Sequence, residues 1–248
     1  MILLKNQSEI AKMRAAGKIV ASTLRRVSEE IAPGRTTKEL DTIAHRLITE
    51  AGGYPSFLGY RDYPAATCIS VNDVVVHGIP GDMVLKEGDI VDLDFGVLLD
   101  GYHADSAWTF PVGQISPENQ RLLNVTLESL HQGLAKARVG NTTGDIGHAV
   151  QKYVESNGYS IVKDLVGHGI GRNLHEEPSV PNYGKPHTGE KLKEGTTICI
   201  EPMVNAGTWK VTTDDDNWTV RTADRKNSAH FEHTIVITKG GIDILTSE

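Results

Sequence analysis

Acidic residues interrupt several of the most apolar stretches of this sequence. Asp92 and Asp94 alternate with apolar residues in one such run, and Asp105, Glu201 and Glu232 occur in similar surroundings. A carboxylate is almost never buried without a partner, so these acids must meet cations or hydrogen-bond donors. Any one of them alone is more readily explained as the partner of a lysine or arginine. Four of them, however, come as two pairs with few basic residues nearby, which favours a shared site.

Carboxylates that converge on one site cannot all stay ionised unless positive charge compensates them. Two divalent cations would neutralise Asp94, Asp105, Glu201 and Glu232, and the imidazole of His168 would complete the ligand set. Oxygen-rich ligation with one nitrogen suits Mn²⁺, Fe²⁺ or Co²⁺, and Zn²⁺ is also compatible. The residues therefore predict a site for two divalent metal ions (Co, Mn, Fe or Zn) without deciding among them.

The two pairs of acids belong to segments that repeat one another. The tetrapeptide Leu-Lys-Glu-Gly at 85–88 recurs at 192–195, and the same offset carries Asp94 onto Glu201. His-Gly-Ile at 77–79 recurs at 168–170, and Gly-x-Thr-Thr at 34–37 recurs at 140–143. Such ordered self-similarity indicates an internal duplication. We interpret residues 1–248 as a single catalytic domain with halves of about 1–115 and 116–248.

Hydrophobic periodicity predicts two helices in each half. We expect a helix from Ile10 to Ile31, a second that Thr36 caps, a third that starts at Ser116 and a fourth that Thr142 caps. Apolar runs then predict strands at 67–77, 90–99, 104–112, 196–204 and 231–238. Helix pairs packed on antiparallel sheet give an α+β fold of two pseudo-two-fold-related halves. Because no polar linker separates the halves, we expect them to share one sheet and one core.

The overall composition is that of an ordinary globular protein. The 248 residues carry 25 Lys and Arg against 32 Asp and Glu, a net charge of −7 that leaves no basic footprint for nucleic acid or anionic membrane. Two cysteines far apart exclude a disulfide framework and a cysteine-based zinc site. No stretch resembles a signal peptide or approaches the roughly 20 apolar residues of a membrane span. We expect a cytoplasmic protein.

The segment around His168 carries a specific resemblance to a known family. Residues 167–178 read Gly-His-Gly-Ile-Gly-Arg-Asn-Leu-His-Glu-Glu-Pro, with Val-His-Gly-Ile-Pro at 76–80 and Glu-Pro-Met-Val at 201–204. These motifs resemble the type I methionine aminopeptidases over essentially the whole chain. The family's dinuclear metal site corresponds, in order, to Asp94, Asp105, His168, Glu201 and Glu232. The resemblance implies the pita-bread fold and a bacterial-style enzyme that consists of the catalytic domain alone.

The resemblance also implies a reaction, the removal of the N-terminal methionine from new polypeptides when the second residue is small. A water or hydroxide bridging the two metals would attack the scissile amide, with Glu201 as general base. His175 would contact the carbonyl oxygen, and His77 the peptide nitrogen or the leaving amine. The partners would be nascent chains, with transient contact to the ribosome, and the enzyme would act as a monomer.

A methionine pocket follows from the same resemblance. It comprises side chains that suit an unbranched thioether, namely Phe57, Tyr60, Tyr63, Cys68, His77 and Trp218. Many bacterial members differ at Phe57, Arg61 and Leu174, which rim this pocket, so these positions bear on affinity rather than on the chemistry.

Three further histidines adjoin the predicted ligands in the sequence. We expect His103, His230 and His233 to be structural or to support the ligands from outside the site. His230 and His233 are expected to face away from Glu232.

Two other functions stay open. An X-Pro peptidase of the prolidase or aminopeptidase P kind shares the fold and the metals, but usually carries a separate N-terminal domain. A non-catalytic binding module of this fold would have lost metal ligands, whereas all five are present here. Assays with a Met-Ala-Ser peptide and an X-Pro peptide separate the first alternative, and metal analysis separates the second.

Overall fold

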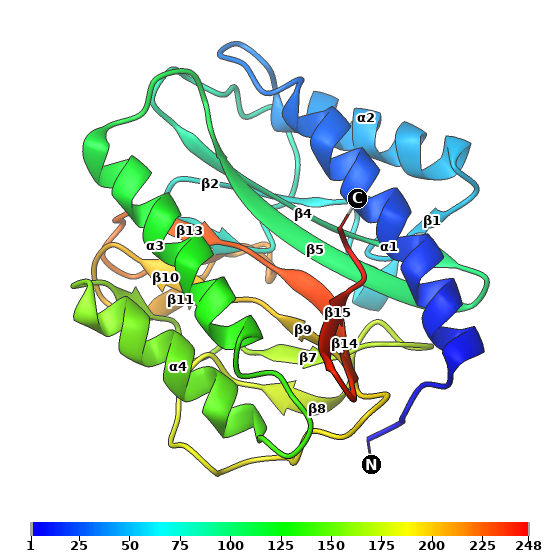
Figure 1. Cartoon of the computed structure of the whole chain (residues 1–248). Helices are drawn as coiled ribbons and strands as arrows, with labels where there is room; N and C mark the ends of the chain where they lie inside the picture. Colours follow the sequence, from blue (N-terminus) through cyan, green and yellow to red (C-terminus); the bar gives the residue numbers. More distant parts are fainter. Residues whose placement is uncertain (1, 248) are drawn as a thin grey trace.

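The computed structural model describes residues 2–247, and its long helices lie in two pairs. In Figure 1, α1 and α2 (blue) lie together on one side, α3 and α4 (green) lie on the other, and strands run between them. No helix of residues 2–247 combines the length and the apolar character needed to cross a membrane. The helices are α1 (Gln7–Ser28), α2 (Thr37–Glu50), α3 (Pro117–Leu134), α4 (Thr143–Ser156) and the short 3₁₀ helix η1 (Tyr60–Asp62).

Capping residues fix the helix starts that the sequence predicts. Thr36 and Thr142 each accept the backbone N–H of an acid three residues on, and that acid accepts the N–H of the threonine in return. The predicted end of the first helix near Ile31 is wrong, because α1 stops at Ser28. The chain tightens there into hydrogen bonds between residues three apart, ahead of Pro33.

The described strands pair without exception in antiparallel register, which confirms the α+β class. They form four hydrogen-bonded sheets, so the expectation of one shared sheet is wrong. The sheets have the orders β1-β4-β2 with β5 on β4, β13-β10-β6, β11-β12-β3, and β15-β14-β9-β7-β8. The strands are β1 (Tyr54–Pro55), β2 (Cys68–Val71), β3 (Val74–Val76), β4 (Ile90–Leu99), β5 (Tyr102–Pro111), β6 (Ser160–Ile161), β7 (Gly167–Gly169), β8 (Glu176–Val180), β9 (Thr197–Ile200), β10 (Met203–Asn205), β11 (Val211–Thr213), β12 (Val220–Thr222), β13 (Ser228–His230), β14 (His233–Thr238) and β15 (Gly241–Ile244).

The sheets are separate because several apolar runs break into two strands. The run at 67–77 divides at Asn72, whose φ of 56° turns the backbone. The run at 196–204 divides at Glu201 and Pro202, since proline cannot donate to a ladder. The run at 231–238 begins only at His233, after a break that contains Glu232. Two predicted ligands therefore lie in strand breaks.

Corresponding residues of the two halves make corresponding backbone hydrogen bonds ahead of α2 and α4. Gly34 N–H donates to Leu85 O at 2.8 Å, and Gly140 N–H donates to Leu192 O at 3.1 Å. Each leucine N–H in turn donates, at 2.8 Å, to the residue that follows the glycine. The similar segments noted in the sequence thus adopt the same local pairing.

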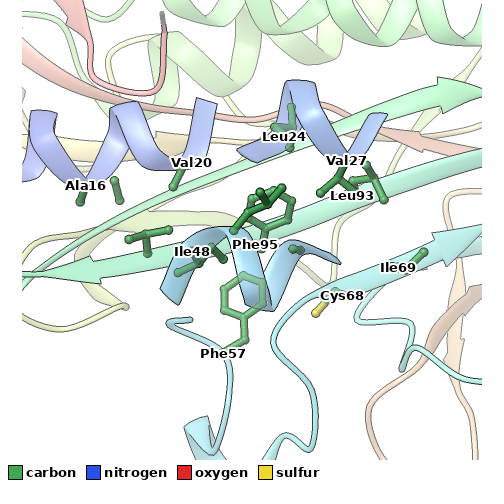
Figure 2. Packing of buried hydrophobic residues seen from close by; sticks show 14 of the residues in the cluster. Ala16, Val20, Leu24, Val27, Ile48, Phe57, Cys68, Ile69, Leu93 and Phe95 are labelled. Carbon is green, nitrogen blue, oxygen red and sulfur yellow. The ribbon is translucent and has the colours of Figure 1, made fainter. Parts of the chain in front are cut away.

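Buried apolar residues gather in two large cores rather than in the single one expected. One lies between α1, α2 and β4, where Val20, Ile48, Leu93 and Phe95 are buried together (Figure 2). The other lies against α3 and α4, and Trp108 packs against both. Alternation along β4 turns Leu93 and Phe95 to the helices, so the even-numbered residues point to the opposite face. That face holds the acids.

Helix α1 reaches the C-terminal segment at Gly17, where a Cβ would lie 2.0 Å from Leu245 O. Gly17→Ala is expected to destabilise the protein by about 1–3 kcal/mol through overpacking, although alanine favours an isolated helix by about 1 kcal/mol. Urea unfolding measures this change. Ala15→Gly, on the exposed face of the same helix, provides a control that loses helix propensity alone. A Gly17→Ala protein more stable than the wild type would contradict the packing described.

Candidate metal centre

The β-ladder of β4 brings three predicted site residues to one face. Cys68 pairs with Asp94 across β2 and β4, and Asp105 pairs with Gly96 across β4 and β5. Asp94 pairs with Ala107, so the two aspartates are diagonal neighbours on the same face of the sheet. Both side chains are buried.

Glu232 joins these aspartates because its backbone is bonded to β5. Glu232 N–H donates to Ala107 O at 2.8 Å, and the Ser106 hydroxyl donates to Glu232 O at 2.6 Å. Beyond it, the Thr234 hydroxyl both accepts from Asp105 N–H and donates to Asp105 O. Three carboxylate oxygens consequently lie within 4.8 Å of one another, one each from Asp94, Asp105 and Glu232.

His168 lies in β7 of another sheet, and Glu201 directly follows β9, the strand that pairs with β7. His168 Nε2 lies 3.6 Å from Glu201 Oε1, and its Nδ1–H donates to Gly169 O at 2.8 Å. Because a carbonyl only accepts, this bond fixes the tautomer and leaves the Nε2 lone pair facing the carboxylate. Burial lowers the pKa of His168 to about 3, so the ring is neutral. The backbones approach closely, since a Cβ on Gly167 would lie 2.4 Å from Cys199 O.

The four carboxyls are held where they repel one another. Burial, and then their mutual repulsion, raise the pKa values of Asp94, Glu201 and Glu232 well above the usual range. Burial raises the pKa of Asp105 to about 7. In the part of the chain described, no lysine or arginine forms an ion pair with them, and the buried oxygens Asp105 Oδ1 and Glu232 Oε1 have no hydrogen-bond partner. Oxygen donors beside a neutral imidazole lone pair fit divalent cations.

Asp92 and His230 also face this site, so the expectation that His230 points away from Glu232 is wrong. His230 Nδ1 lies 3.3 Å from Asp92 Oδ2, and its Nε2 lies 3.8 Å from Glu201 Oε2. The Thr109 hydroxyl lies between Asp92 Oδ1 and His230 O. The sequence spacing indicates this placement, because Asp92 and His230 each stand two residues before a predicted ligand and residues two apart in a strand face the same side.

The other histidines beside ligands lie outside the cavity. His103 Nδ1 is 2.9 Å from Ser56 Oγ, and His233 Nδ1 is 2.8 Å from Thr246 Oγ1. Cys199, which the sequence analysis did not consider for the site, has its sulfur near His168 and Glu232. Burial and neighbouring carboxylates raise the pKa of this thiol, so it is protonated.

A cavity of about 220 Å³ opens above the carboxylates. All the residues predicted for the methionine pocket line it, and so do Arg61 and Leu174. Four further apolar residues, which the sequence analysis did not assign to the pocket, complete the wall, namely Val76, Leu165, Val166 and Met203.

The aromatic wall of this cavity is built by edge-to-face contacts. The Tyr63 ring lies 6.5 Å from Phe57 and 5.0 Å from Trp218, measured between centroids. Asp216 holds Trp218 in place by accepting its backbone N–H at 2.8 Å. An apolar, ring-lined cavity of this size accommodates one medium-sized side chain.

Two neutral histidines flank the cavity. Burial lowers the pKa of His77 to about 4, and its ring stands edge-on to Trp218. His175 lies at the exposed rim, with Nδ1 2.8 Å from the Tyr60 hydroxyl and its ring centroid 4.2 Å from that of His168. Loss of water around the ring, and then the Arg61 guanidinium, lower the pKa of His175.

Comparisons with known proteins agree with this geometry. A model of metallopeptidase family M24 matches residues 11–239. Methionine aminopeptidase 1 of Bacillus subtilis is 53% identical over 246 residues, which cover 99% of each chain. The crystal structure of methionine aminopeptidase from Thermotoga maritima is 46% identical, covers both chains completely and superposes with a TM-score of 0.99.

More distant structures share the fold alone. Prolidase from Pyrococcus furiosus is 24% identical with a TM-score of 0.81, and the match covers 99% of this chain but 65% of the prolidase. Together with the Thermotoga structure, this likeness confirms the pita-bread fold that the family resemblance implies. The chain therefore belongs to metallopeptidase family M24 and, within that family, to the methionine aminopeptidases.

Proposed function

We propose that this enzyme removes the N-terminal methionine of polypeptides whose second residue is small. The observation that carries the proposal is the position of the four repelling carboxyls and His168 directly beneath a ring-lined cavity. The methionine side chain would fill that cavity, and the free amine would approach the carboxylates. Aromatic rings and the Cys68 sulfur suit a thioether through dispersion and sulfur–aromatic contacts.

The five residues Asp94, Asp105, His168, Glu201 and Glu232 would hold two divalent ions, either Co, Mn, Fe or Zn. Asp105 and Glu232 would each help to hold both ions. Their unpartnered buried oxygens and their closeness to Asp94 support this assignment. His168 and Glu201, 3.6 Å apart, would bind the second ion. When bound, such ions polarise the scissile carbonyl and lower the pKa of a water molecule.

Three side chains would then move or hold protons. The Glu201 carboxylate accepts a proton from the attacking water and passes that proton to the leaving amine. His175 donates an N–H to the carbonyl oxygen as charge develops there. His77 faces the peptide nitrogen. Their lowered pKa values keep both histidines neutral, and a neutral imidazole still has one N–H to donate.

We also propose the setting in which the enzyme works. It would act as a monomeric cytoplasmic protein on nascent polypeptides, with transient contact to the ribosome. Residues 1–248 would form one catalytic domain of two duplicated halves, which the matching hydrogen bonds of Gly34 and Gly140 support. An X-Pro peptidase remains the second candidate because prolidase shares the fold.

Glu201→Gln is expected to lower kcat by roughly 10²- to 10⁴-fold at saturating metal, because the amide cannot accept the proton. Initial rates with a Met-Ala-Ser peptide measure this loss, and metal content is determined on the same sample. Glu177→Gln, an exposed acid on β8, is the matched control and should keep full activity. Full activity of Glu201→Gln would contradict its role as base.

Met-Ala-Ser should be cleaved, whereas its N-acetylated form should not, because an acetylated amine cannot approach the carboxylates as a free donor. Release of methionine is followed by chromatography. An X-Pro peptide in parallel tests the second candidate. Equal turnover of the free and acetylated peptides would contradict amine recognition, and preferential cleavage of the X-Pro peptide would contradict the proposed specificity.

The metal-free protein is expected to lose stability as the pH rises above about 6.5. Unfolded carboxyls ionise near pH 4, whereas folded Asp105 keeps its proton to about pH 7. Burial and mutual repulsion also hold the pKa values of Asp94, Glu201 and Glu232 well above the usual range. The native state thus binds more protons than the unfolded state in this window, so stability falls as pH rises. Histidines with lowered pKa values change the pH dependence of stability only below this window.

Thermal unfolding of chelator-treated protein measures this slope, and Mn²⁺ should raise the Tm more at higher pH than at lower pH. Asp94→Asn removes one of the titrating groups and should give a shallower slope. A Tm that is independent of pH in the metal-free protein would show that the carboxyls do not repel one another as described.

A further inference from the structure

A buried ion pair that the proposed chemistry does not use ties the N-terminal segment to the loop that carries His175. Lys5 Nζ lies 2.5 Å from Glu176 Oε2, and the two side chains are 5% and 4% exposed. Among the lysine and arginine ion pairs of residues 2–247, the next most buried, Arg221 with Asp73, is 22% and 21% exposed. A buried ion pair adds little net stability over apolar residues of similar volume. Its contribution is therefore to fix the positions of the segments that it joins.

The pair holds the 170–175 turn between β7 and β8 from several sides. Glu176 Oε1 accepts the backbone N–H of Asn173 at 3.2 Å, which closes the turn. Gly171 packs against the pair, because a Cβ there would lie 2.3 Å from Lys5 Cε. Lys5 is itself anchored, since its N–H donates to Gly195 O at 2.7 Å and its Nζ donates to Leu3 O at 2.8 Å.

His175 directly precedes Glu176, so this anchor acts on its backbone, while the Tyr60 hydroxyl holds its ring 2.8 Å away. We infer that Lys5 is a positioning residue for His175, and that the Lys5–Glu176 ion pair holds the imidazole where it meets the scissile carbonyl. The inference rests on the role proposed for His175. A charge-assisted bond gives this position a directional constraint that apolar packing lacks.

Lys5→Met tests the inference because it leaves Glu176 buried and unpaired, which displaces the turn. We expect kcat for Met-Ala-Ser to fall by about 10- to 100-fold with little change in KM, since small misplacements of a catalytic group have effects of this size. In a double-mutant cycle, adding Lys5→Met to His175→Ala should lower kcat by less than about two-fold further, because both changes remove the same interaction. Metal content should equal that of the wild type.

Losses that multiply in the double mutant would overturn the inference, as would an unchanged kcat of Lys5→Met. Should Lys5→Met fold poorly, the double variant Lys5→Met with Glu176→Gln removes the unpaired charge. The Tm of this double variant should recover while its kcat stays low. Recovery of both the Tm and kcat would also overturn the inference. Arg172→Met is the control on the same turn. The Arg172 side chain is 66% exposed in its 3.7 Å pair with Glu9, so this variant should change kcat less than about two-fold. A wild type that does not cleave Met-Ala-Ser would instead refute the proposed function.

Discussion

The mutual repulsion of four buried carboxyls is the constraint around which the molecule is organised. Asp94 and Asp105 come from one sheet, and Glu201 and Glu232 come from breaks between strands, yet their oxygens meet beneath one cavity. Such a cluster is unfavourable in the bare protein, as the raised pKa values show. The scaffold must therefore be rigid enough to keep the groups together until cations compensate them.

That rigidity comes from different devices on the two sides of the site. The ten-residue strands β4 and β5 fix two aspartates by register and are backed by the α1–α2 core. The glutamates lie outside regular pairing, where backbone and hydroxyl bonds to β5 hold Glu232 and close backbone packing at Gly167 brings His168 near Glu201. A strand break allows a side chain to leave the alternation that a continuous ladder would impose.

Much of the fold and the cluster of carboxyls could be predicted from local patterns, whereas the residues of the methionine pocket followed from the family resemblance. Capping residues and periodicity located the four helices, and acids within apolar runs identified the residues that line the floor of the cavity. Errors arose where backbone geometry departs from simple alternation. The run at 67–77 turns at Asn72, the run at 196–204 breaks at Pro202, and the supposed single sheet becomes four. His230 was assigned to the wrong face, although its spacing from Glu232 places it on the cavity side.

By itself, the sequence determined which chemistry was available: its spacing of carboxylates and histidines, its caps and its repeated segments are properties of neighbouring residues. Tertiary structure alone decided which distant groups meet. It set Asp92 against His230, completed the cavity wall with residues such as Leu165 and Met203, and joined Lys5 to Glu176. The physical reason is that such contacts depend on the approach of separate segments, which burial and packing of the whole chain determine and no local pattern encodes.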